Sequence, residues 1–320
     1  MRIEPFSELQ KNDWDDFVWR SNNGTLFHTR RFLSYHPADR FKDASLVFYK
    51  ENQILALLPA TEINRDGQKI LSSHQGASYG GFVALSPLSV KDAFLLVENL
   101  QDYARQEKYD GIDMTLPPQI YLNRPNNYIE FAMVKNGFTY RKREISSVIP
   151  LDFSVDEILN TFNPSSRRAV RRAKKQNVFV EQSNQYETFY EILKRNLKMR
   201  HQVTPTHTVE ELLKLKDLFP ERIKLFAAFA GETMVAGVVM FICNSNVALA
   251  FYISHNEEYQ HFRGVNLLFY EIIKWCIEKK YRFLDYGIFT VNMEPNWGLG
   301  RFKESFGAQG VFRDSFVKMF

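Results

Sequence analysis

Two charged residues near the C-terminal end are the first candidates for chemistry. Lys303 follows Phe302 on a short predicted helix, after the glycine-containing segment 298–300. A lysine there could stabilise an oxyanion or hold a phosphate or ribose; the alternative is a solvated surface lysine, the usual environment of this residue type. Asp285 ends a predicted strand, where it could accept a proton from an amine or cap the turn that follows. We take Lys303 and Asp285 as the candidate catalytic residues.

Other kinds of catalytic centre find little support in the sequence. There is no Gly-x-Ser-x-Gly motif, and neither Cys243 nor Cys276 has an obvious histidine partner. Both cysteines lie inside apolar runs without Cys-x-x-Cys spacing, which is typical of reduced core residues. The 7 histidines are scattered without metal-ligand spacing, so no metal site is predicted. The sequence therefore favours direct transfer over a covalent acyl-enzyme.

A strongly basic helix is predicted over residues 165–176. Asn163 and Pro164 form a start signal, with Asn as the N-cap and Pro at the first helical position. The helix carries six basic residues: Arg167, Arg168, Arg171, Arg172, Lys174 and Lys175. So many like charges repel one another unless a phosphate-bearing partner neutralises them. We expect such a partner to be tRNA, a nucleotide sugar or anionic lipid at the inner membrane face; a purely solvated helix face is the alternative.

Four further side chains could bind a reactant. Tyr252, on the third predicted strand of the second half, could donate a hydrogen bond to a reacting group, although a buried core tyrosine is the commoner case. His28, Tyr79 and Trp297 could line an acceptor groove. For each of these three residues, packing in a core or a lid is an equal alternative.

Length and composition limit the class of protein. The chain has 320 residues, which favours two domains, and its 45% hydrophobic and 24% charged content is ordinary for a folded protein. The net charge is only +4, so no DNA partner is expected and any basic surface must be local. The N-terminus has no apolar stretch of the signal-peptide kind, and no run is long enough to span a bilayer. We expect a cytoplasmic protein.

The same layout of elements occurs twice. In the second half, predicted strands over 223–230, 234–242 and 247–253 precede an amphipathic helix over 265–280 and a strand at 283–285. In the first half, predicted strands over 46–49 and 54–60 precede a helix over 90–107 and a strand over 111–116. Recurrence at half the chain length indicates a duplicated domain; the alternative is a generic likeness between two mixed α/β domains.

These elements predict an α/β fold of two tandem lobes, each a mixed sheet flanked by helices. We place the N-terminal lobe at 1–153 and the C-terminal lobe at 154–320, the latter beginning with the basic helical segment. Residues 154–201 are predicted to be mostly helical. No Ser/Gly-rich linker separates the lobes.

Over nearly the whole chain, the sequence resembles the FemABX-like peptidyltransferases and their relatives in the GNAT acetyltransferase superfamily. The resemblance rests on the order and spacing of short motifs rather than on any one of them. They are Trp14 and Phe17, Gly24–Thr29, Tyr79–Gly81, the Arg-rich segment before Asn177-Val178, Met234–Gly237, Asp285–Gly287 and Arg301–Gly307.

The resemblance implies GNAT-like lobes, no tightly bound cofactor, and a co-substrate that is acyl-CoA or an aminoacyl-tRNA. It also implies an amine acceptor, either a small molecule or a cell-envelope precursor, and places the Phe302-Lys303 pair at the donor. Gly264 and Asn266 fall on the phosphate-binding loop of GNAT enzymes, which reads Gln/Arg-x-x-Gly-x-Gly/Ala; here the first and last positions are His261 and Asn266. Where relatives that build peptidoglycan carry a Trp and then a Lys for a nucleotide-linked acceptor, this chain has Phe32 and then Tyr35 or His36.

The leading hypothesis is an N-acyltransferase that moves an acyl or aminoacyl group from an activated donor directly to an amine. A simple acetyl-CoA-dependent N-acetyltransferase is a second enzyme hypothesis. A non-catalytic RNA- or membrane-surface-binding module on the same fold is the alternative from a different class, and the basic helix favours it.

Overall fold

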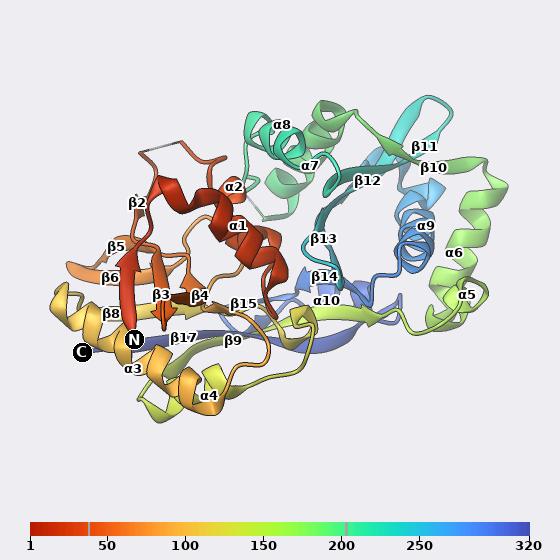
Figure 1. Ribbon diagram of the computed structural model, residues 1–320. Coiled ribbons are helices and arrows are strands. Elements are labelled where there is room, and N and C mark those ends of the chain that lie inside the picture. The colour runs from red at the N-terminus through yellow and green to blue at the C-terminus, as the bar shows by residue number, and fades with distance from the viewer. Residues whose placement is uncertain (38, 202–203) are drawn as a thin grey trace. The chain divides into compact units, whose positions relative to one another are not determined.

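The computed structural model describes residues 1–37, 39–201 and 204–320 and divides them into two compact units (Figure 1). Unit 1 comprises Met1–Glu144 and Phe312–Phe320, and unit 2 comprises Ile145–Val311. These units differ from the predicted ranges 1–153 and 154–320. Two long strands, β9 (Thr139–Pro150) and β17 (Gln309–Met319), each have residues in both units.

Unit 1 contains two sheets. One has the strand order β1-β3-β4-β7, and the second runs from the end of β17 through β8, β6 and β5 to β2. Its strands are β1 (Arg2–Pro5), β2 (Lys42–Asp43), β3 (Leu46–Lys50), β4 (Gln53–Leu58), β5 (Thr61–Arg65), β6 (Gln68–Ser73), β7 (Val83–Ala84) and β8 (Gly111–Thr115). Its helices are α1 (Lys11–Arg20), α2 (Arg30–Leu33), α3 (Val90–Gln106) and α4 (Tyr128–Lys135).

Alternation along β3 and β4 buries both faces of the first sheet. Leu46, Phe48 and Leu58 point into a core shared with α3 and α4. Val47 and Leu57 point the other way, into a smaller core with Trp14 and Phe17 of α1. Because successive strand residues face opposite sides, one short apolar strand can serve two helical layers.

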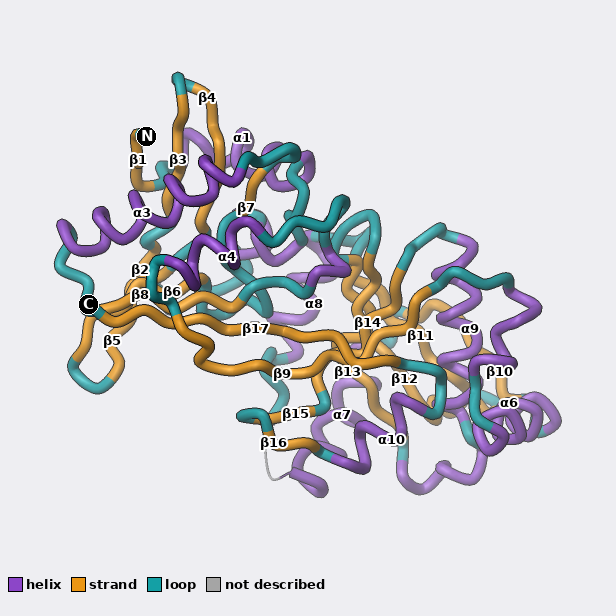
Figure 2. Tube along the Cα trace, turned by 90° about the horizontal axis from the view of Figure 1, so that it is seen from below, coloured by secondary structure: helices purple, strands orange, loops and turns teal. Residues whose placement is uncertain are grey.

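Unit 2 is built on one mixed sheet with the order β10-β11-β12-β13-β14-β9. Its own strands are β10 (Val178–Ser183), β11 (Ile223–Ala230), β12 (Thr233–Ile242), β13 (Val247–His255) and β14 (Phe283–Ile288), with the small hairpin β15 (Thr290–Val291) and β16 (Glu294–Pro295) beyond β14 (Figure 2). Its helices are α5 (Ile158–Thr161), α6 (Pro164–Lys175), α7 (Tyr186–His201), α8 (Val209–Leu218), α9 (Gly264–Glu278) and α10 (Trp297–Glu304).

Helices cover both faces of the unit 2 sheet. The core on one side joins Val238 and Met240 of β12 to Leu268 and Ile272 of α9. On the other side, α7 approaches so closely that a Cβ on Gly237 would lie 2.4 Å from the ring of Phe189. The sheet is therefore the middle of three layers, with α7 and α9 on opposite faces (Figure 1).

The predicted α/β architecture is confirmed, and so are the predicted strands and long helices of each half. One segment is different: residues 154–201 include the edge strand β10, which pairs antiparallel with β11. The stretch after Asn177 begins with Val178, Phe179 and Val180, residue types that favour a strand, so the expectation of a mostly helical segment overlooked this signal. Its hydrogen bonds come from β11, which lies far along the chain.

The two units share a local strand order. In unit 2, β14 is parallel to β13 and antiparallel to β9. In unit 1, β8 is parallel to β6 and antiparallel to β17. The third strand in each case comes from the other half of the sequence: β9 follows α4 of unit 1, and β17 follows α10 of unit 2. The two units therefore do not divide the sequence at one point.

Candidate active site in unit 2

The parallel strands β13 and β14 separate part-way along their length. They pair from Val247 with Phe283 to Leu249 with Asp285, and the described residues show no pairing between them beyond that point. β13 continues to His255 and contains a bulge, because Val239 of β12 pairs with Tyr252 while Met240 pairs with Ala250. Separation and bulge together leave backbone groups of both strands open to a ligand. Asp285 lies at the point of separation.

The Asp285 carboxylate is completely buried. Its Oδ1 accepts hydrogen bonds from Ser146 Oγ at 2.8 Å and from the backbone N–H of Gly287 at 2.7 Å. Gly287 has a φ of +70°, a conformation that favours glycine. Asp285 therefore caps the turn that ends β14, which is one of the two roles expected from the sequence.

Lys303 is buried too, with 2% of its surface exposed, so the surface-lysine alternative is excluded. Its Nζ donates to the carbonyl oxygens of Gly287 and Ile288, each at 2.8 Å. Burial lowers the pKa of Lys303 to about 8, and the charge of Asp285 opposes that shift. An ammonium group has three protons to donate; two are used by these carbonyls, and among the described residues no acceptor is found for the third.

The N-terminus of α9 lies beside that of α6. Asn266 Nδ2 donates to Ser166 Oγ at 3.5 Å, and Lys174 lies 4.0 Å from Glu271, so the two helices run parallel. Arg263, in the left-handed conformation, precedes α9, and no side chain caps the first turn. Uncapped N–H groups at a helix N-terminus attract anions.

Gly264 is required by packing, because a Cβ there would lie 2.7 Å from Val235 Cγ2. Asn266 occupies the final position of the loop, where relatives have a small residue. Its side chain turns toward Ser166 of α6, which keeps it away from the backbone amides of the first turn. Asn266 therefore does not cap the first turn of α9, in spite of the departure in sequence.

The basic residues of α6 divide by exposure. Arg168, Arg171 and Arg172 are exposed and Arg167 is half-buried. In the part of the chain that the structure describes, none of the four forms an ion pair, whereas Lys174 approaches Glu271. Ser166 and Val170 face the core instead. The four arginines of α6 therefore have no acidic partner among the described residues.

Tyr252 lies on β13 beyond the separation from β14, as part of a polar pair. Its hydroxyl is 2.8 Å from His207 Nδ1 and accepts from the His207 backbone N–H at 3.1 Å. Burial raises the pKa of Tyr252 to about 12, so the hydroxyl keeps its proton at neutral pH. Tyr252 is a buried tyrosine that holds the segment before α8.

Phe302 and Trp297 lie on α10 in different surroundings. The ring of Phe302 is 5.2 Å from that of Phe306 and packs against the core of unit 2, so it anchors the helix that carries Lys303. Trp297 is 70% exposed at the start of the helix. Of the two, only Trp297 offers its ring to a ligand.

His28 and Tyr79 belong to unit 1 and are fully buried there. Thr25 N–H donates to His28 Nδ1 at 3.0 Å, so Nε2 carries the proton and donates to Gly80 O at 3.0 Å. Burial lowers the pKa of His28 to about 4. Tyr79 donates to the hydroxyl of Tyr121 at 3.2 Å. The expectation that His28 and Tyr79 line an acceptor groove is corrected: their partners within unit 1 hold both in its core.

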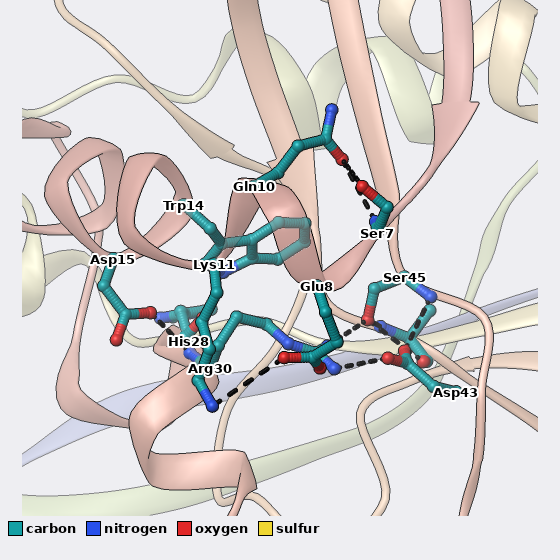
Figure 3. Close-up of polar contacts among 11 residues, drawn as sticks. Ser7, Glu8, Gln10, Lys11, Trp14, Asp15, His28, Arg30, Asp43 and Ser45 are labelled. Atoms are coloured by element: carbon teal, nitrogen blue, oxygen red, sulfur yellow. Dashed lines mark hydrogen bonds and ion pairs between the residues drawn. The ribbon is translucent and has the colours of Figure 1, made fainter.

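The segment after His28 is held by an internal polar network (Figure 3). Trp14 Nε1 donates to the His28 carbonyl at 2.8 Å, and the Arg30 N–H donates to Asp15 at 2.6 Å. The Arg30 guanidinium binds Asp43 and donates to Ser45 Oγ at 3.0 Å. Asp43 neutralises the charge of Arg30. Arg30 is therefore no evidence that this segment binds the phosphates of a nucleotide-linked acceptor.

Two residues of the site were missed in the sequence. Ser146 reaches Asp285 from β9, and His207 reaches Tyr252 from the segment before α8. Neither belongs to a motif, and each becomes a neighbour only through sheet pairing and helix packing. No local signal in the sequence could have identified them.

The structure gives no support to a cysteine nucleophile or a metal site among the described residues. Burial raises the pKa of the Cys276 thiol, which disfavours the reactive thiolate. Within residues 1–37, 39–201 and 204–320, no group of three or more His, Cys, Asp and Glu side chains could hold a metal ion. Over the same residues, no helix has the length and hydrophobicity needed to cross a membrane.

A match to a known family agrees with the geometry of unit 2. Residues 163–304 match the model of the acetyltransferase (GNAT) domain family. This range runs from the N-cap of α6 to the end of α10 and includes the separated strands. Residues 163–304 are thus similar to the GNAT acetyltransferase domain. No curated protein sequence matches the chain.

Solved structures extend the likeness to the whole chain. FemX has a TM-score of 0.76 at 14% identity, covering 100% of this chain and 98% of that one. L-PGS from Bacillus licheniformis has a TM-score of 0.60 at 10% identity, covering 98% and 93%. A tandem GNAT protein from the clavulanic acid biosynthesis pathway has a TM-score of 0.57 at 10% identity, covering 99% and 98%. The predicted resemblance to FemABX-like and GNAT proteins, and the fold of two GNAT-like lobes, are confirmed.

Proposed function

We propose that this protein is an N-acyltransferase that uses acyl-CoA as donor and transfers the acyl group directly to an amine. The observation that carries the proposal is the separation of β13 and β14 after Leu249 and Asp285, beside the uncapped N-terminus of α9. The family match supports acyltransferase activity in general, and GNAT domains use acyl-CoA without a tightly bound cofactor. The donor and the acceptor are our proposals.

The donor would bind along the opening between the strands. Its diphosphate would lie at the first turn of α9, where the N–H groups of Gly264 and Val265 and the half-buried Arg167 supply positive potential. The acyl group would then reach the point where β14 leaves β13. Such a pose uses preorganised backbone groups, which cost little to orient.

Lys303 would stabilise the oxyanion that forms when the amine attacks the thioester. Its ammonium is fixed by Gly287 and Ile288, and one proton remains to be donated. A fixed cation in a dry site stabilises developing negative charge strongly. Asp285 would act as a positioning residue, because it holds the turn to which Lys303 binds.

The acceptor would be an amine on a small molecule or a cell-envelope precursor, reached from the side of Trp297. An exposed tryptophan at the start of α10 suits the apolar part of such a molecule. A location at the inner membrane face would suit an envelope precursor, with anionic lipid meeting the basic face of α6. The proposed location at the inner membrane face rests only on the exposed arginines of α6.

An aminoacyl-tRNA is the second candidate donor, and a specific observation favours it. Arg168, Arg171 and Arg172 are exposed on α6 without a described counter-charge, and a tRNA backbone would supply one. A protein that binds RNA or membranes without catalysis would use the same arginines and would leave the opening between β13 and β14 unused.

Isothermal titration with acetyl-CoA, with an aminoacyl-tRNA and with vesicles of anionic lipid separates these possibilities. We expect acetyl-CoA to bind in the micromolar range and to release CoA when a suitable amine is added. Binding of tRNA with no binding of acetyl-CoA would transfer the proposal to the second donor. Binding of tRNA or vesicles without transfer from either donor would indicate a binding module.

A further inference from the structure

Two buried charges of opposite sign meet at the turn that ends β14. Asp285 has none of its surface exposed, and Lys303 has only 2% exposed. Asp285 holds the N–H of Gly287 and Lys303 holds its carbonyl, so a single residue lies between the two side chains. A buried charge is costly unless an opposite charge or hydrogen bonds compensate it. The two side chains are therefore expected to affect each other's charge as well as to share a turn.

Ser146 fixes the Asp285 carboxylate from the neighbouring strand. β9 pairs antiparallel with β14, with Val148 opposite Asp285 and Ser146 opposite Ile288. The Ser146 hydroxyl, which is completely buried, donates to Asp285 Oδ1 at 2.8 Å. The Gly287 N–H donates to the same oxygen. Donors from two strands hold the carboxylate in one orientation, and hydrogen bonds to a carboxylate favour its charged form.

The protonation state of Lys303 decides whether the site has a donor to offer. A neutral lysine amine has two N–H donors, whereas the ammonium has three. The carbonyl oxygens of Gly287 and Ile288, each 2.8 Å from Nζ, use two donors in either form. Loss of one proton would therefore remove the positive charge and also the last donor available to a ligand.

Burial and the neighbouring carboxylate act on this proton in opposite directions. Burial lowers the pKa of Lys303 to about 8, and the charge of Asp285 raises it. The other ionisable side chains of β14, β15, β16 and α10 are Tyr286, Glu294, Arg301 and Glu304. Burial raises the pKa of Tyr286 and keeps it neutral, and the remaining three are exposed, where water and salt screen their charges. Asp285 is therefore the carboxylate placed to keep the ammonium charged.

We propose that Asp285, held by Ser146, acts through its charge to keep Lys303 in the ammonium form, and so preserves the donor for the developing oxyanion. Asp285 and Ser146 are then positioning residues that act through Lys303. The proposal rests on the proposed function only where transfer is concerned, because the charge on Lys303 can be followed without any substrate.

Asp285→Asn separates charge from shape, because the amide oxygen can still accept from Ser146 and from the Gly287 N–H. The titration of Lys303 is followed in the intact protein by NMR of ¹³C-labelled lysine side chains, and its signal is assigned by its absence in Lys303→Met. We expect the midpoint of this titration to fall by about one to three pH units, the usual effect of a nearby opposite charge. Glu304→Gln removes an exposed carboxylate at the next position of α10 and should leave the midpoint nearly unchanged.

Ser146→Ala provides a second measurement if Asp285→Asn does not fold. This variant keeps the charge of Asp285 but removes one of the two donors that orient it, so the midpoint should move in the same direction by a smaller amount. A midpoint equal to that of the wild type, in whichever of the two variants folds, would overturn the proposal.

Acetyl transfer provides an independent comparison. If Lys303 donates to the oxyanion, the pH above which transfer declines should fall in Asp285→Asn by the same amount as the titration midpoint. A midpoint that moves while this pH stays constant would overturn the use of the donor in transfer. Absence of transfer by the wild type would contradict the proposed function, and the titration would still decide whether Asp285 controls the charge of Lys303.

Discussion

Lys303 and Asp285 hold the same glycine from its two ends. Asp285 Oδ1 accepts from the Gly287 N–H at 2.7 Å, and Lys303 Nζ donates to the Gly287 carbonyl at 2.8 Å. The two charged side chains therefore fix the turn at the end of β14, where that strand has just left β13. A buried pair with this geometry is needed for the shape of the site as well as for its charge.

Lys303→Met should reduce stability. The substitution leaves the carbonyl oxygens of Gly287 and Ile288 without their donor, and each buried unpaired group costs about 1–3 kcal/mol. This revises the simpler expectation for an exposed lysine, whose loss would leave the fold unaffected. Urea unfolding measures the effect, and Lys279→Met, at an exposed position of unit 2, is the matched control. A midpoint equal to that of the wild type would show that the carbonyls find other donors.

The same lysine should make stability rise with pH on the alkaline side. The folded chain loses this proton near pH 8, and the unfolded chain keeps it up to about 10.5. The unfolded state therefore binds more protons in that window, so the contribution of Lys303 to the free energy of unfolding increases there, by roughly 3 kcal/mol at most. Unfolding free energies of wild type and Lys303→Met, measured from pH 7.5 to 10.5, should therefore diverge, because the wild type gains stability over the variant as the pH rises. Parallel curves would contradict the lowered pKa.

Gly264→Ala should destabilise unit 2 by about 1–3 kcal/mol, because its new Cβ would overpack Val235. The variant should also bind acetyl-CoA more weakly, since the first turn of α9 has to shift. Combining it with Val235→Ala makes room for the added methyl, so the double variant should be more stable than the sum of the two single changes predicts. Additive costs in a double-mutant cycle would mean that the close contact is not the cause.

Replacing Arg168, Arg171 and Arg172 of α6 by Gln should weaken binding of the phosphate-bearing donor and leave stability nearly unchanged. These side chains are exposed, and their attraction to phosphate decreases as salt screens it. The difference from wild type should therefore shrink between 50 and 300 mM salt, about the range over which screening changes most. A control with Arg20, Lys91 and Lys135 changed to Gln removes the same charge from unit 1. Equal effects of the two triple variants would leave no special role for α6.

His28 should make the protein less stable in acid. Its pKa is about 4 in the folded chain and 6.5 without burial, so between these values the unfolded state binds more protons. Stability is then lost as the pH falls from 6.5 to 4, by up to roughly 3 kcal/mol from this residue. His74, with a pKa also lowered to about 4, adds a similar loss, so the test compares wild type with His28→Gln. The variant should have the shallower pH dependence; identical slopes would disprove the assignment.

Much of the fold could be read from local pattern. The apolar spacing of α3 and α9 and the strand–turn–strand segments at 46–58 and 223–242 are strong signals, and Asn163 with Pro164 marked the start of α6 correctly. Local pattern does not show which strands β9 and β17 pair with. Their ends pair with β14 and β8, which lie more than a hundred residues away, so the composition of each unit depends on contacts at long sequence separation.

The site was predictable only in part, for a related reason. Lys303, Asp285 and Gly264 were selected by residue type and motif, and the structure places all three in unit 2 around the opening of the sheet. Exposure was harder to infer: a lone lysine and a lone histidine are usually exposed, yet Lys303 and His28 are buried because carbonyl oxygens from distant segments accept their protons. Ser146 becomes a neighbour of Asp285 entirely through tertiary packing.

Hydrogen exchange with and without acetyl-CoA tests the central claim most directly, because it needs no acceptor. If the donor binds between β13 and β14 with its diphosphate at α9, acetyl-CoA should slow exchange in peptides that contain residues 263–267 and 285–288. Peptides from α7 and from unit 1 should change little. Absence of protection at both segments under saturating acetyl-CoA, or protection confined to other parts of the chain, would contradict the proposed acyl-CoA site.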